Sequence, residues 1–125
     1  MVYATIATLL AVFYTFFLSM KVGKMRDTHD VQSPAITGNI DFERAFRAHQ
    51  NTIEQLVIFL PCLWLGAAFI GDLPAGTLGL VWVGGRLLYA NAYEGGESRF
   101  LGMWVTILPT AALFLAALFG VVQRL

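Results

Sequence analysis

The sequence predicts an all-α integral membrane protein, built as an antiparallel bundle of four transmembrane helices. Of its 125 residues, 58% are hydrophobic and only 13% are charged, and the mean hydropathy is +0.68. Water-soluble domains of this size do not normally combine these values. Long runs without a charged side chain recur along the chain, and a bilayer core needs about 20 apolar residues per helix. The composition therefore excludes an ordinary soluble domain.

Four membrane spans within a single domain, residues 1–125, account for these runs. We expect the spans at about residues 2–20, 42–70, 75–93 and 98–123. The second and third reach spanning length only if polar residues near their ends belong to the same helices. No positive segment precedes the first run, so we interpret it as a retained helix and not as a cleaved signal peptide.

The basic residues predict the orientation in the membrane. Seven of the eight flank the first or the third connection, and only Arg124 lies at the opposite end of the bundle. This positive-inside bias predicts cytoplasmic connections and both termini outside. The compact loops favour a bacterial inner membrane, with periplasmic termini and a site that faces the cytoplasm. The formal net charge is zero, so we expect no nucleic-acid partner.

A polar stripe enters the second span in the segment FERAFRAHQNTIEQ. At about 100° per residue, Arg44, Arg47, Asn51 and Glu54 project within an arc of about 80°, while His49 points to the far side. No second histidine or cysteine stands at a metal-ligand spacing from His49, so we expect no metal site.

A second stripe lies on the third span. Arg86, Tyr89 and Tyr93 follow the spacing i, i+3, i+7 and share one helix face. Both stripes approach the cytoplasmic ends of their helices, so we expect them to meet at one level of the bundle.

The stripes carry more cations than anions, which favours an anionic ligand. Charge at membrane depth costs about 3 kcal/mol per residue on insertion scales. Arginine binds a carboxylate through two parallel hydrogen bonds, Glu54 can hold an ammonium group, and Asn51 can donate and accept. A zwitterion with several carboxylates fits this set. The alternative is that Arg47, Glu54 and Arg86 pair with one another inside the bundle without any ligand.

Two motifs in this sequence resemble those of the MAPEG family, the membrane-associated proteins of eicosanoid and glutathione metabolism. The second helix of that family reads approximately E-R-x-x-R-A-x-x-N-x-x-E, and the matching residues here are Glu43, Arg44, Arg47, Ala48, Asn51 and Glu54. The segment GRLLYANAY is similar to the third-helix pattern, through Gly85, Arg86, Tyr89 and Tyr93.

The resemblance implies a homotrimer that binds glutathione between neighbouring subunits. The glutathione contacts that it implies are Arg47, Asn51, Glu54, Arg86, Tyr89 and Tyr93, with His49 at the position of a glutamine that contacts glutathione in some members. Arg44 is a structural or ligand contact. Arg99, before the fourth helix, is the residue implied to stabilise the glutathione thiolate. Gln55 stands where some members have a tyrosine.

The function implied by the resemblance is that of a membrane-bound glutathione S-transferase in detoxification. The thiolate would attack a lipophilic electrophile that arrives from the membrane lipids, and the same chemistry extends to peroxidase activity on lipid hydroperoxides. One alternative is a non-catalytic member of the family that binds lipid or glutathione. A small multidrug exporter has a similar length, but such transporters carry an essential acidic residue in the first span, and residues 1–20 hold no charge.

Overall fold

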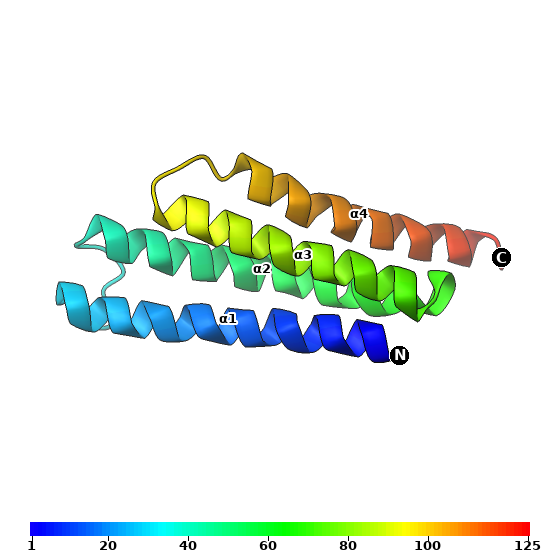
Figure 1. Ribbon diagram of the computed structural model, residues 1–125, viewed down its shortest axis with the longest axis horizontal. Coiled ribbons are helices and arrows are strands. Elements are labelled where there is room, and N and C mark those ends of the chain that lie inside the picture. The colour runs from blue at the N-terminus through cyan, green and yellow to red at the C-terminus, as the bar shows by residue number, and fades with distance from the viewer.

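Four helices, antiparallel along one axis, make up the computed structural model, which describes all residues from 1 to 125 (Figure 1). They are α1 (Val2–His29), α2 (Ile40–Ile70), α3 (Asp72–Glu94) and α4 (Phe100–Val122). The pair α2 and α3 lies between α1 and α4, which do not contact each other. Both termini lie at one end of the bundle, and the α1–α2 and α3–α4 connections lie at the other. The predicted antiparallel four-helix fold is confirmed.

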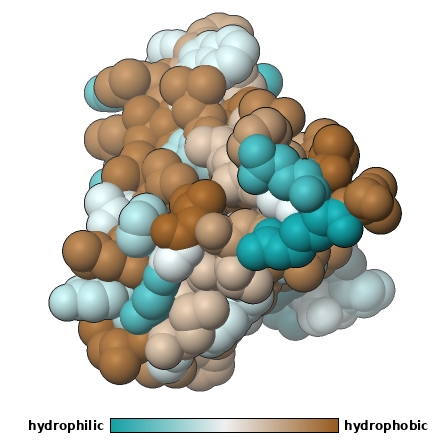
Figure 2. All heavy atoms as spheres, turned by 90° about the vertical axis from the view of Figure 1, so that its right-hand side faces the viewer, coloured by the Kyte–Doolittle hydropathy of each residue, from teal (hydrophilic) through white to brown (hydrophobic).

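The outer surface of the bundle is largely apolar. Figure 2 looks onto the end that carries both termini, where hydrophobic atoms cover most of the outline and strongly hydrophilic atoms gather in a few patches. By length and composition, α1, α2 and α4 can each cross a membrane. Helix α3 has 23 residues, but four glycines and Arg86 interrupt its apolar residues. An apolar exterior of this extent fits a lipid environment.

The helices continue beyond the apolar runs at the end that carries the two connections. Helix α1 extends to His29, and Lys21 on it forms an ion pair with Glu94 at the end of α3. Helix α2 begins at Ile40 because the side chain of Asn39 accepts hydrogen bonds from the first free backbone N–H groups. The guanidinium of Arg26 donates to the carbonyl of Ala35 at 2.6 Å. These contacts hold the polar end of the bundle together.

Helices α3 and α4 pack at backbone distance. A methyl group on Gly102 would collide with the backbone N and Cα of Tyr89, and one on Gly85 would lie 2.8 Å from the backbone N of Thr106. In lipid the hydrophobic effect does not drive helices together, so their association depends on close van der Waals contact. Small residues such as these glycines allow that contact. The two glycines set the spacing of α3 and α4.

Gly102→Ala should therefore destabilise the protein, and Gly84→Ala should not. No atom lies within 4 Å of a methyl group placed on Gly84, and alanine favours helix more than glycine does. We expect Gly102→Ala to lower the free energy of unfolding by about 1–3 kcal/mol through overpacking. Thermal unfolding in detergent measures both variants, and equal midpoints would contradict the close contact.

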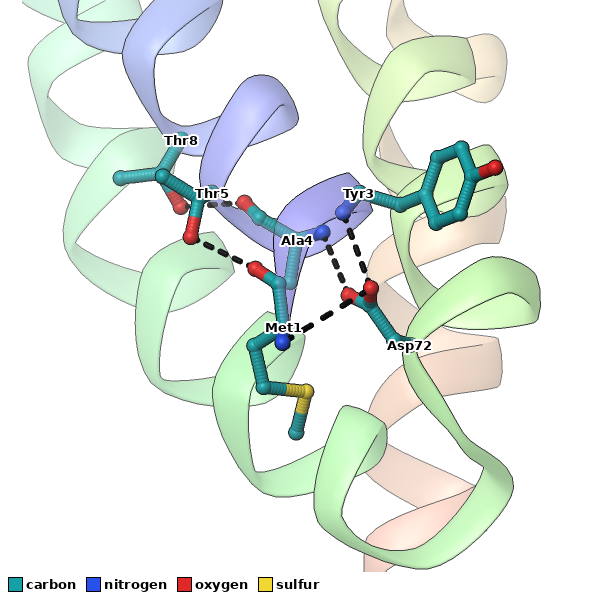
Figure 3. Close-up of polar contacts among 6 residues, drawn as sticks. All are labelled: Met1, Tyr3, Ala4, Thr5, Thr8 and Asp72. Carbon is teal, nitrogen blue, oxygen red and sulfur yellow. Dashed lines mark hydrogen bonds and ion pairs between the residues drawn. The ribbon is translucent and has the colours of Figure 1, made fainter.

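Asp72 caps the first helix from the start of α3. Its carboxylate accepts hydrogen bonds from the backbone N–H of Tyr3 at 3.0 Å and of Ala4 at 2.8 Å (Figure 3). Asp72 precedes the expected third span. Desolvation raises the pKa of this carboxyl. The backbone hydrogen bonds and the N-terminal ammonium together lower the pKa by more than desolvation raises it, so the pKa lies below its ordinary value. The cap joins α1 to the α2–α3 turn.

Asp72→Asn should lower the thermal midpoint, with exposed Asp27→Asn as the control. The pKa of Asp72 is lower in the folded than in the unfolded protein. The charge of Asp72 therefore stabilises the fold fully at pH values above the unfolded pKa, about 3.9, and this stabilisation is lost as the pH falls through the folded pKa. The difference between wild type and Asp72→Asn should accordingly be constant near neutral pH and shrink below about pH 3.9. A difference that grows on acidification would show that the charge of Asp72 does not stabilise the fold.

Candidate functional site

An open cavity of about 330 Å³ lies between α2, α3 and α4, at the end of the bundle that carries the α3–α4 connection. Twelve residues line it: Arg47, Gln50, Asn51, Glu54, Gln55, Arg86, Tyr89, Tyr93, Arg99, Met103, Thr106 and Ile107. The two polar stripes therefore meet at one level, as the helical spacing predicts, and α4 closes the third side.

Arg86 lies at the buried base of the cavity. Its side chain is only 1% exposed. Its Nη2 donates to Asn51 Oδ1 at 2.8 Å and to Thr52 Oγ1 at 2.9 Å, and its Nε donates to Thr52 Oγ1 at 3.2 Å. No carboxylate pairs with it. Neutral oxygens of α2 thus compensate a charge on α3.

Two stacked tyrosine rings of α3 lie between two arginines that line the cavity. The Arg86 guanidinium lies 4.3 Å from the centroid of the Tyr89 ring, and the Arg99 guanidinium lies 5.6 Å from that of Tyr93. The two tyrosine rings stack with centroids 5.8 Å apart. Cation–π attraction at such distances holds the guanidinium groups over the ring faces. Arg99 is the residue immediately before α4, and the contact with Tyr93 brings its side chain into the site.

The cavity carries an excess of positive charge. Three arginines line it, whereas Glu54 is its only carboxylate. The ion pairs in the chain join the N-terminus to Asp72 and Lys21 to Glu94, so Arg47, Glu54 and Arg86 do not pair with one another. The alternative of a self-compensated charge cluster is therefore not what the structure contains. No group of three or more His, Cys, Asp or Glu side chains is arranged for a metal.

Two of the residues singled out in the sequence lie outside this cavity. Arg44 is one helical turn nearer the start of α2 than Arg47. It lies beside the α3–α4 connection, where a methyl group on Gly96 would be 3.0 Å from its Nη1. His49 is half-buried on another face of α2 and lines no part of the cavity. Within one chain, neither residue therefore lines the cavity.

The sequence reasoning missed several residues of the site. Thr52 was not considered, although it binds Arg86 directly. Met103, Thr106 and Ile107 follow Arg99 at i+4, i+7 and i+8, a one-face spacing that would have indicated the contribution of α4. Gln50 carried no signal of its own.

A second hollow, about 370 Å³ in volume and mostly apolar, adjoins the cavity along α2 and α4. Gln55 and Ile107 line both hollows. The remaining lining residues are Ile58, Cys62, Thr110, Ala111 and Phe114. The cavity with the charged residues therefore lies next to an apolar groove, with Gln55 and Ile107 between the two.

Fold and cavity together define an integral membrane protein of four antiparallel helices with a cationic cavity at one end. More narrowly, residues 4–119 match the model of the MAPEG family, and the chain belongs to that family. The resemblance predicted from the two helix motifs is confirmed.

Several relatives are similar in sequence over most of the chain. An uncharacterised protein of Synechocystis is 39% identical over 100% of this chain and 92% of its own length. Human microsomal glutathione S-transferase 2 is 37% identical over 84% of this chain and 72% of its own length. Guinea pig (Cavia porcellus) leukotriene C4 synthase is 36% identical over 69% of this chain and 57% of its own length.

Proposed function

We propose that the protein is a membrane-bound glutathione S-transferase, with the cationic cavity as its glutathione site. The observation that carries this proposal is the set of three guanidinium groups opposed by a single carboxylate. Glutathione offers two carboxylates to the arginines and one ammonium to Glu54. The names of the microsomal transferase relatives support the same class of reaction.

Arg99 has the position and charge to activate the thiol. A free thiol with a pKa near 8.5 is only a few per cent thiolate at neutral pH. A guanidinium stays protonated and, close to sulfur in a partly dry site, lowers the thiol pKa by about two units. The proton leaves to solvent, the thiolate attacks an electrophilic carbon, and the leaving group departs as the S–C bond forms.

The apolar groove along α2 and α4 supplies a place for the second substrate. A lipophilic electrophile dissolved in the bilayer reaches this groove sideways, while glutathione enters from water at the polar end. A lipid hydroperoxide in the same groove would be reduced to its alcohol, with a second glutathione completing the reaction to the disulfide. We propose a cytoplasmic orientation of the site on the basis of the positive-inside bias.

We also propose that the working unit is a homotrimer, as the family resemblance implies. The cavity is open, with Arg47 and Glu54 exposed at its side. A neighbouring copy that covers this side would exclude water and would bring its own His49 toward the ligand. Native mass spectrometry of the detergent-solubilised protein tests the stoichiometry, and a monomer that is active at nanomolar concentration would refute the shared site.

Arg47→Ala and Glu54→Ala should each lower glutathione conjugation of a chlorinated nitroaromatic by about 10-fold to 100-fold. Each removes one charged hydrogen-bond partner of the tripeptide, an interaction of about 1.5–3 kcal/mol. Lys24→Ala, an exposed cation at the same end of the bundle, is the matched control and should retain activity. If wild-type protein neither binds glutathione in calorimetry nor turns over the electrophile, the proposed function is wrong.

Arg99→Ala should separate binding from activation. We expect glutathione to remain bound, with a thiolate absorbance that titrates about two pH units higher than in wild type, and kcat at neutral pH to fall accordingly. Arg99→Lys should retain part of the effect. If Arg99→Ala changes neither quantity while the protein binds lipid, the non-catalytic alternative is favoured.

Ala111→Phe should act on the electrophile alone. The larger side chain fills the apolar groove and removes apolar contacts with a long-chain electrophile. Such a loss costs about 1–3 kcal/mol, so kcat/KM for this electrophile should fall by about tenfold. The KM for glutathione should stay unchanged. Equal losses for the long-chain substrate and for a small chlorinated aromatic would place the second substrate elsewhere.

A further inference from the structure

The hydrogen bonds of the Thr52 hydroxyl can be arranged in only one way. Thr52 is fully buried, and its Oγ1 donates its single proton to the carbonyl of Ala48 at 2.9 Å. A hydroxyl has one proton and two lone pairs. Both lone pairs are therefore left for Arg86, whose Nε and Nη2 lie 3.2 and 2.9 Å away. Thr52 acts as a fixed acceptor that orients the guanidinium.

The oriented guanidinium in turn fixes the amide of Asn51. A guanidinium can only donate hydrogen bonds, so the Asn51 atom that lies 2.8 Å from Arg86 Nη2 must be the carbonyl oxygen. The opposite atom, Nδ2, makes no hydrogen bond within the chain, and Asn51 lines the cavity. An unconstrained asparagine can turn either end of its amide toward a ligand, whereas here Arg86 holds the oxygen and leaves the NH₂ group without a partner in the chain.

We propose that Arg86 and Thr52 are positioning residues: they hold Asn51 so that its amide NH₂ donates to a carboxylate or carbonyl oxygen of glutathione. This inference rests on the proposed function and deepens it. It changes the role of Arg86 from a direct ligand contact, as the resemblance implies, to a residue that acts through Asn51. It also assigns a role to Thr52, which occupies a position that the second-helix motif leaves unspecified.

Asn51→Asp tests the inference with the fold preserved. Aspartate has the same shape and still accepts from Arg86, now as an ion pair, so the thermal midpoint should not fall. The ligand, however, meets an oxygen in place of the NH₂ group. We expect the Kd for glutathione, measured by calorimetry in detergent, to rise at least tenfold, the size of one lost hydrogen bond to a charged group.

A charge-matched variant separates orientation from simple repulsion. Gln50→Glu adds the same charge to the lining of the cavity without touching Arg86. Asn51→Asp should weaken glutathione binding at least fivefold more than Gln50→Glu does. Equal weakening by the two variants, or unchanged binding by Asn51→Asp, overturns the positioning role.

Thr52→Val removes the acceptor and keeps the shape of the side chain. With Arg86 no longer fixed, the KM for glutathione should rise several-fold while kcat at saturating glutathione stays close to wild type. Thr52→Ser should restore the wild-type KM. Thr15→Val is the control, because Thr15 also donates to the carbonyl four residues earlier but binds no arginine. A change in kcat alone, or the same change in Thr15→Val, contradicts the inference.

The outcomes distinguish this inference from the function on which it rests. Wild-type protein that does not bind glutathione overturns both. Wild-type protein that binds glutathione, together with an Asn51→Asp variant that binds it equally well, overturns the positioning role alone and leaves the transferase proposal standing.

Discussion

The buried guanidinium of Arg86 constrains the rest of the site. It lies on α3 within an apolar bundle and has no carboxylate to pair with, so its charge requires neutral acceptors from a neighbouring helix. Thr52 and Asn51 supply them, and both are on α2. This requirement fixes the rotation of α2 about its own axis. The same rotation turns Arg47 and Glu54 toward the cavity.

A steric constraint acts on the other side of α3. Gly85 and Gly102 allow α3 and α4 to approach until backbone contacts backbone, which carries the start of α4 alongside Tyr89 and Tyr93. Arg99 then lies over the Tyr93 ring. Hydrogen bonds thus join α2 to α3, and close backbone packing joins α4 to α3. The cavity lies where the three helices meet. Helix α1 contributes no residue to it.

Helical spacing alone predicts much of this arrangement. The two stripes gave the direction in which Arg47, Asn51 and Glu54 project, and the structure brings them together with the residues of α3. Their contact with glutathione stays a prediction. Spacing gives an angle around the helix but not the position of a residue along the site, which is why Arg44 belongs to the stripe and yet lies outside the cavity.

Contacts between distant segments explain what the sequence could not reveal. Arg99 became a candidate only through the family resemblance, because its place depends on the length of the α3–α4 connection and on the glycine contacts behind it. Thr52 looked like an ordinary helix residue, since its role exists only when α3 presents a guanidinium to it. The ion pair between Lys21 and Glu94 joins residues 73 positions apart, and no local pattern encodes it.

The charges of the cavity and of the proposed ligand give a physical reason to expect that binding and activation go together. Three arginines and one glutamate leave the cavity with two positive charges in excess. Glutathione with a protonated thiol carries a net charge of minus one, because it has two carboxylates and one ammonium, so it leaves one positive charge uncompensated. Loss of the thiol proton removes that excess. In the proposed complex, the electrostatics that would bind the tripeptide would therefore also favour its thiolate, because charge imbalance costs more wherever the ligand displaces water.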